Sequence, residues 1–196
     1  MRTFLLLLLP ALIFAQWETS TPFPSEGECE AEIDKIHECA PDDGFFKKLE
    51  NFELFNKTEI SSLIDQLDTV LDCFGDLKCK SSRLIEAFIK TREFILTQLY
   101  GELETCLIDN GLLSQLEQTC EKPTTVLEGP PPVNPDSEEC DMGYYISCSM
   151  KELRKHPEDC SREQRNLFYK VLKAMRASCL IYEELERTDE DEVLRK

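Results

Sequence analysis

The chain has 196 residues, with 22 basic and 39 acidic side chains, a formal net charge of -17 and 41% hydrophobic residues. Such a charge repels the phosphates of nucleic acids and the surfaces of anionic membranes, so neither is an expected partner. The hydrophobic fraction is ordinary for a folded protein, and the length suits one domain or two small ones.

Residues 1–15 have the pattern of a secretory signal peptide. An apolar stretch runs from Phe4 to Phe14, and Ala15 offers the small residue that precedes a cleavage site. The stretch is too short for a permanent membrane anchor, and no later segment approaches the length of a membrane span. We therefore expect a secreted, extracellular protein that begins with a flexible N-terminal arm over residues 16–27.

Apolar residues at helical spacing predict an all-α structure of about six helices. The clearest stripe runs from Ile60 to Phe74, with Thr58 as the expected N-cap, and Ser81 or Ser82 is expected to cap the following helix. A capping box, with Ser161 at the N-cap and Gln164 three residues later, opens the last helix. The expected helical segments are 28–39, 45–55, 58–74, 84–99, 144–155 and 162–185, with two shorter pieces carrying Cys106 and Cys120.

Residues 122–139 contain five of the ten prolines, which excludes a helix or a central strand. We expect an exposed proline-rich surface loop. A PxxP match from Pro132 to Pro135 lies in it, and a spacer is the favoured interpretation in a secreted chain. Residues 187–196 form an acidic C-terminal tail, in which Asp189 to Glu192 lack the ligand order of an EF-hand calcium loop.

Ten cysteines behind an export signal predict five intramolecular disulfides and no free thiol. Their connectivity is not readable from the sequence. Cys29 and Cys39 are ten residues apart, which is about 15 Å along a helix, whereas a disulfide needs Cα atoms within about 7 Å. If one helix carries both, each must bond elsewhere. The cysteines are Cys29, Cys39, Cys73, Cys79, Cys106, Cys120, Cys140, Cys148, Cys160 and Cys179.

The cysteine counts leave two domain organisations open. Six cysteines precede the proline-rich loop and four follow it, so two independently closed halves are possible. A half of that size would bury little surface and depend heavily on its disulfides. We favour a single disulfide-rich helical domain over residues 28–186 with the loop on its surface.

No catalytic, metal or cofactor signature is present, and we expect no enzyme activity and no cofactor. The chain lacks a Gly-x-Ser-x-Gly elbow, an HExxH helix and a CxxC pair. His37 falls in a predicted helix and His156 precedes Pro157, so both are expected to be surface residues rather than general bases.

The segments CEAEIDKIHEC and LDTVLDCFGDLKC, the signal peptide and the last helix with Cys179 together resemble one known family. It is the nematode family of secreted, cysteine-rich helical proteins catalogued as domain of unknown function number nineteen. The resemblance covers roughly residues 28–185 and implies an all-helical, disulfide-bonded extracellular domain without established catalytic residues. The long proline-rich loop is a departure that puts single-domain continuity in question.

Two functions from different classes remain. The preferred hypothesis is an extracellular protein-interaction module with an unidentified partner, which also carries an N-glycan on Asn56 of the sequon Asn56-Lys57-Thr58. The alternative is a carrier of a small hydrophobic ligand in a cavity between helices. Its lining would come from the phenylalanines, although helical spacing favours them as core residues: Phe45, Phe46, Phe52, Phe55, Phe74, Phe88 and Phe94.

Overall fold

The computed structural model describes residues 24–42, 44–50, 57–120 and 140–187. Every regular element in these ranges is helical, which confirms the predicted all-α class. There are eight such elements: six correspond to the expected longer segments, and the π-helical turn η1 and α6 correspond to the two shorter pieces expected to carry Cys106 and Cys120. In chain order they are α2 (Glu26–Cys39), α3 (Phe45–Glu50), α4 (Lys57–Phe74), α5 (Lys80–Leu99), η1 (Glu104–Ile108), α6 (Leu112–Cys120), α7 (Gly143–Leu153) and α8 (Arg162–Arg187).

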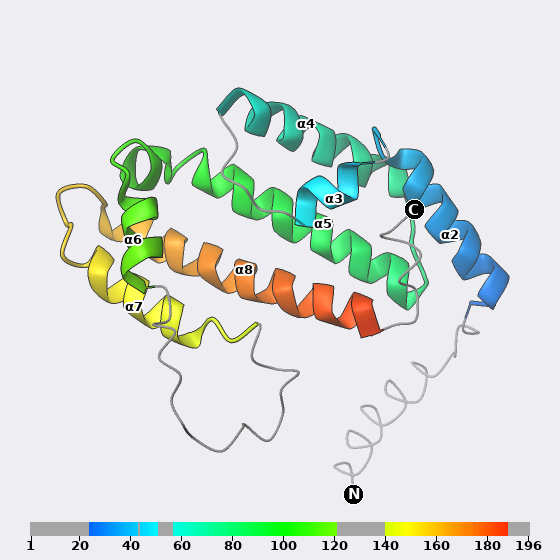
Figure 1. The fold of residues 1–196 in the computed structure, drawn as a ribbon. Helices are drawn as coiled ribbons and strands as arrows, with labels where there is room; N and C mark the ends of the chain where they lie inside the picture. The colour runs from blue at the N-terminus through cyan, green and yellow to red at the C-terminus, as the bar shows by residue number, and fades with distance from the viewer. Residues whose placement is uncertain (1–23, 43, 51–56, 121–139, 188–196) are drawn as a thin grey trace, which may run out of the picture.

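The two longest helices, α5 and α8, lie side by side through the middle of the molecule (Figure 1). They run antiparallel, and an ion pair between Lys80 and Glu184 joins the start of α5 to the end of α8. The remaining helices pack around this central pair, with α2, α3 and α4 toward one end and η1, α6 and α7 toward the other.

The core forms two hydrophobic clusters along the central pair. The first joins α5, mainly its N-terminal half, to α2, α3 and α4, and it includes Leu185 of α8. The second joins the C-terminal end of α5 to η1, α6, α7 and the N-terminal half of α8, where Phe168 is fully buried. Each cluster collects the apolar stripes of helices that would otherwise expose them to water.

Five disulfides fix the helices to one another, and the described residues contain no free cysteine. Because α2 is continuous from Glu26 to Cys39, its two cysteines bond to other elements, as the helix geometry required. Each bridge closes 28 to 54 residues, which in the chain-entropy model stabilises the fold by about 3 to 4 kcal/mol. The pairs are Cys29–Cys79, Cys39–Cys73, Cys106–Cys160, Cys120–Cys148 and Cys140–Cys179.

The turn between α4 and α5 is held by α2. Gly75 ends α4, as predicted, and its φ of 71° is a backbone conformation that glycine adopts without strain. The Lys35 ammonium of α2 donates a hydrogen bond of 2.6 Å to the carbonyl oxygen of Phe74. A positive charge at the C-terminus of α4 complements the helix dipole there.

Four predicted helix starts differ from the structure, and that of α7, at Gly143 rather than Tyr144, differs by one residue. α2 begins at Glu26 rather than Glu28, because Ser25 and Glu28 form a capping box inside the predicted arm. α4 already includes Lys57, so Thr58 lies within the helix. α5 begins at Lys80, so neither Ser81 nor Ser82 is its N-cap, and both side chains are buried in its first turn instead.

The capping box of the last helix is confirmed. The Ser161 hydroxyl accepts the backbone N–H of Gln164 at 3.1 Å, and the Gln164 side chain accepts the backbone N–H of Ser161 at 2.9 Å. α7 ends at Leu153, two residues before the predicted end, because the backbone turns before Pro157. The predicted signal peptide, residues 51–56, the predicted proline-rich loop and the predicted acidic tail after Arg187 lie outside the described residues.

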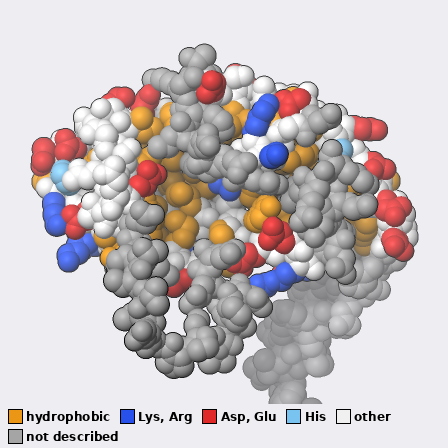
Figure 2. Space-filling model, in the orientation of Figure 1, with side chains coloured by type: hydrophobic (Ala, Val, Ile, Leu, Met, Phe, Trp, Pro, Cys, Tyr) orange, Lys and Arg blue, Asp and Glu red, His pale blue; other side chains and the backbone are white. Residues whose placement is uncertain are grey.

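Figure 2 shows hydrophobic side chains gathered near the middle of one face, over α5 and α8, with acidic side chains mostly toward its edges. Within the ranges that the structure describes, no helix combines the length and apolarity needed to cross a membrane.

Candidate functional site

An open groove of about 790 Å³ lies between α7 and α8. α7 is fixed at one wall because Cys148 bonds to Cys120 of α6 and Leu153 is fully buried. α8 forms the other wall. Residues lining the groove are Gly143, Ile146, Ser147, Met150, Lys151 and Arg154 from the α7 side, and Asn166, Tyr169, Lys173 and Arg176 from α8.

Helical periodicity separates the groove wall of α8 from its core face. Asn166, Tyr169, Lys173 and Arg176 recur at steps of 3, 4 and 3 and therefore share one side of the helix. Phe168, Val171 and Leu172 occupy the opposite side, in the second core cluster. Burial of that apolar side holds α8 in a fixed rotation, which presents the polar stripe to the groove.

The start of α8 is also anchored outside its capping box. The Gln164 amide donates a hydrogen bond of 2.9 Å to the carbonyl oxygen of Glu102, in the connection between α5 and η1. The Arg165 guanidinium donates to the carbonyl oxygen of Cys160, which is itself bonded to Cys106. These contacts position the groove wall on a rigid support.

The groove is positively charged in a strongly acidic protein. Among the described residues, four basic side chains line it, namely Lys151, Arg154, Lys173 and Arg176, and no carboxylate does. All four are exposed, and none forms an ion pair with another described residue. The Lys173 ammonium lies 4.8 Å from the centre of the Tyr169 ring, within cation–π distance. Clustered charge of one sign raises the local concentration of ligands of the opposite sign.

The same surface carries exposed apolar groups. Ile146 and Met150 are half-buried in the groove, while the side chains of Tyr169 and Leu180 on α8 are 39% and 47% exposed. Tyr169, Lys173, Arg176 and Leu180 follow one another at steps of 4, 3 and 4, so the apolar and basic positions share one stripe of α8. The surface can therefore bind a ligand that is both apolar and acidic.

A second groove of about 640 Å³ lies beside the Cys29–Cys79 disulfide. Three basic residues line it, Lys78, Lys80 and Arg83, but Lys80 is already paired with Glu184. The backbone N–H groups at this start of α5 are also occupied, since they donate to Glu32 of α2. The α7–α8 groove therefore offers more uncommitted charge.

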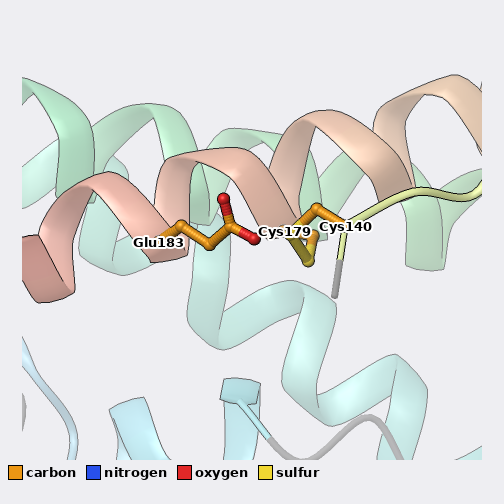
Figure 3. A group of neighbouring side chains, drawn as sticks. All are labelled: Cys140, Cys179 and Glu183. Carbon is orange, nitrogen blue, oxygen red and sulfur yellow. A yellow bond between two sulfur atoms is a disulfide. The ribbon is translucent and has the colours of Figure 1, made fainter. Parts of the chain in front are cut away.

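Two side-chain groups in the described ranges have the composition of a metal site. Figure 3 shows the first, in which the Glu183 carboxylate points toward the sulfurs of Cys140 and Cys179. Both sulfurs are consumed in a disulfide, so neither is available as the thiolate that binds zinc. In the second, His156 lies 3.3 Å from Asp159 beside exposed Glu158. That arrangement is a local side-chain contact between residues three positions apart near the surface.

Both histidines, which the sequence predicted to be surface residues rather than general bases, are half-buried in the structure. The His37 ring is half-buried on α2 and packs edge-on against Phe46, with 5.6 Å between ring centres. His156 is half-buried because it contacts Asp159 just after α7. Packing against neighbours rather than exposure explains both positions, and neither histidine lines either groove.

The phenylalanines proposed for a ligand cavity occupy the core where they are described. Phe45, Phe46, Phe74 and Phe88 are buried in the first cluster, and Phe94 packs partly buried against the second. None of the phenylalanines in the described part of the chain lines either groove. Phe52, Phe55, the Asn56 sequon, the PxxP match and the Asp189–Glu192 run lie outside the described residues.

Sequence reasoning missed the basic side of α8 because only its apolar positions were followed. The sequence nevertheless contains a signal of this basic side. Residues 164–182 contain four basic residues and no acidic one, in a chain with 39 acidic residues. This local reversal of charge on a helix marks the surface that the structure places in the groove.

The comparisons with known proteins leave the chain without a family assignment. No family model matches it, and no curated protein or solved structure does either.

Proposed function

We propose that the chain is a secreted, non-enzymatic interaction module that binds another extracellular protein through the α7–α8 groove. The observation that carries the proposal is the groove itself, with four exposed basic residues, no carboxylate among its described lining residues, and the exposed side chains of Tyr169 and Leu180. Tyrosine and arginine are enriched where protein partners make their strongest contacts. Membership of the nematode family that the sequence resembles belongs to the same proposal.

The scaffold supports this function physically. Five disulfides and two core clusters hold α7 and α8 in place, so little conformational freedom is lost when a partner binds. The acidic remainder of the chain opposes non-specific contact with other acidic proteins, while the groove attracts a complementary one. Affinity and selectivity then come from one surface of the molecule.

A carrier of a small ligand is the second candidate. The volume of about 790 Å³ falls within the range of ligand pockets, and basic groups beside Ile146 and Met150 suit a fatty acid carboxylate with its chain. The groove is open, however, whereas small-ligand sites enclose most of the ligand surface. An open groove flanked by exposed apolar residues favours the protein partner.

Photo-crosslinking tests the proposed function. A benzophenone amino acid replaces Leu180 beside the groove, with the same replacement at exposed Lys90 of α5 as the control. In the extracellular fluid of the producing cells, we expect a discrete protein adduct from position 180 alone. Excess wild-type protein should compete it away, and excess Lys173→Glu/Arg176→Glu variant should not. Adducts of equal yield at both positions, or none, would reject the proposal.

A further inference from the structure

We propose that the partner element in the α7–α8 groove is an acidic amphipathic α-helix of about three turns, with carboxylates near both of its ends. The inference rests on the proposed function and adds the chemistry of the partner. It follows from the length of the groove, its two helical walls and the placement of its charges.

The length of the groove fits a short helix. α7 has 11 residues, and the α8 wall extends from Asn166 to Arg176. At 1.5 Å per residue, both walls are about 15 Å long, which is the length of roughly three helical turns. Two neighbouring helices leave a furrow between their side chains, and docking of an amphipathic helix into such a groove is a recurrent mode of peptide recognition.

The walls are antiparallel. Cys140, just before α7, is bonded to Cys179 in the C-terminal half of α8, so the start of α7 lies beside the later part of α8. The end of α7 lies beside the start of α8 (Figure 1). Lys151 and Arg154 therefore flank one end of the groove, and Lys173 and Arg176 flank the other end from the opposite wall.

This arrangement specifies the charge pattern of the partner. Its carboxylates should fall into two groups about seven to ten residues apart, on opposite sides of the helix, matching the spacing of the two basic pairs at 1.5 Å per residue. Between them, apolar residues at helical spacing would contact Ile146, Met150 and Tyr169. A helix with this pattern buries its apolar stripe while each acidic group meets two cations.

A second copy of this chain is a less suitable partner. Each copy carries a net charge of -17, so long-range repulsion opposes association of two copies. A different protein avoids that repulsion if it presents a short acidic helix on a body without a large negative net charge.

The test uses the full disulfide-bonded protein and three synthetic helical peptides. The first has leucines at i, i+3 and i+7 and glutamates near both ends. The second replaces each glutamate with lysine, and the third has the first composition in scrambled order. Fluorescence anisotropy of labelled peptide gives the affinity, and we expect saturable binding of the first peptide only, weakening as salt is raised.

Two charge-reversal variants locate the binding. Lys173→Glu/Arg176→Glu and Lys151→Glu/Arg154→Glu should each weaken binding of the first peptide about tenfold or more, because two attractions become repulsions. Lys90→Glu/Lys170→Glu makes the same charge change at exposed positions outside the groove lining and should change affinity by less than about twofold. Circular dichroism confirms that all variants retain their helices.

The outcomes of these experiments distinguish a failure of the acidic-helix inference from a failure of the proposed function. Equal binding of the scrambled peptide, or equal loss in the control variant, would overturn the acidic-helix inference. If no peptide binds but the benzophenone at position 180 still crosslinks a protein, the acidic-helix inference is wrong while the proposed interaction module is still supported. Tight binding of laurate at the groove without peptide binding or a protein adduct would overturn both and favour the carrier.

Discussion

Glu32 of α2 caps the start of α5, because its carboxylate accepts the backbone N–H of Cys79 at 3.0 Å across 47 residues of sequence. The backbone N–H of Lys78 and the Ser82 hydroxyl donate to the same carboxylate. The side chain thus supplies from another helix what an N-cap residue normally supplies locally. α2 stabilises both sides of the α4–α5 turn, since Lys35 binds the last carbonyl group of α4.

The first prediction concerns the strength of this cap. Glu32→Gln should lower the free energy of unfolding by about 1 to 2 kcal/mol at pH 7, because charge-assisted hydrogen bonds become neutral ones. Urea denaturation measures the change. Glu30→Gln, at an exposed position of the same helix, removes the same charge and should have little effect. Equal stability of the two variants would contradict the capping role.

The loss of stability caused by Glu32→Gln depends on pH, and the pKa of Glu32 determines the direction of that dependence. Burial alone raises the pKa of Glu32, but the hydrogen bonds from Ser82, Cys79 and Lys78 outweigh it and hold the pKa below its ordinary value. The stabilisation is therefore present above the ordinary glutamate pKa of about 4.3 and is lost as pH falls through the folded-state value. The difference between wild type and Glu32→Gln should shrink toward zero in that acidic window.

The second prediction concerns Glu93 of α5, whose pKa is shifted in the opposite direction to that of Glu32. Burial and the neighbouring Asp68 of α4 raise the pKa of Glu93. Folding therefore favours the protonated form, and stability falls as pH rises from the ordinary glutamate pKa through the raised value. Glu93→Gln should stabilise the protein at pH 7 by less than about 1 kcal/mol, since the group is partly solvated. The gain should disappear below the ordinary glutamate pKa.

Denaturation curves at pH 7 and at pH 3.5 check the second prediction. Glu102→Gln removes the same charge at an exposed position and serves as the control. A Glu93→Gln variant that is less stable than wild type at pH 7 would show that the carboxylate is stabilised rather than penalised in the fold.

The third prediction concerns the disulfides that cross residues 121–139. Cys106–Cys160 and Cys120–Cys148 join the chain before this segment to the chain after it. After cleavage at a protease site inserted within the segment, the two fragments should remain joined until a reductant is added. Non-reducing peptide mapping should recover the same pairs. Separation without reductant would mean two independently closed halves.

Local sequence signals specified most helices but not how they are joined. The Ser161–Gln164 capping box spans three residues, and the stripe from Ile60 to Phe74 repeats within one helix, so both can be read from neighbouring positions. The Glu32 cap and the disulfide pairs join residues 28 to 54 positions apart. Such contacts depend on how the helices pack, and one sequence allows many packings.

In the candidate site, too, one part can be read from the sequence and another depends on how the helices pack. The acid-free run over residues 164–182 is visible in the sequence and marks the basic side of α8. The opposite wall contains Lys151 of α7 and Arg154 just after it, and this depends on the antiparallel placement fixed by Cys140–Cys179. No periodicity within either helix encodes that placement.

The fourth prediction concerns the sequon that ends just inside α4. Asn56 lies outside the described residues, and the helix includes the next residue, Lys57. Protein made in a eukaryotic secretory cell should lose the mass of one N-glycan on treatment with a glycosidase. The variant Asn56→Gln should show no such loss. An unchanged wild-type mass would reject the modification.

The proposed binding surface of this protein is the α7–α8 groove. Backbone amide NMR of the labelled, disulfide-bonded protein during titration with the acidic amphipathic peptide tests it most directly. The account predicts shifts confined to residues 143–154 and 166–180 that are lost in Lys173→Glu/Arg176→Glu. Shifts centred on the groove beside Cys29–Cys79, or no shifts at saturating peptide, would contradict it.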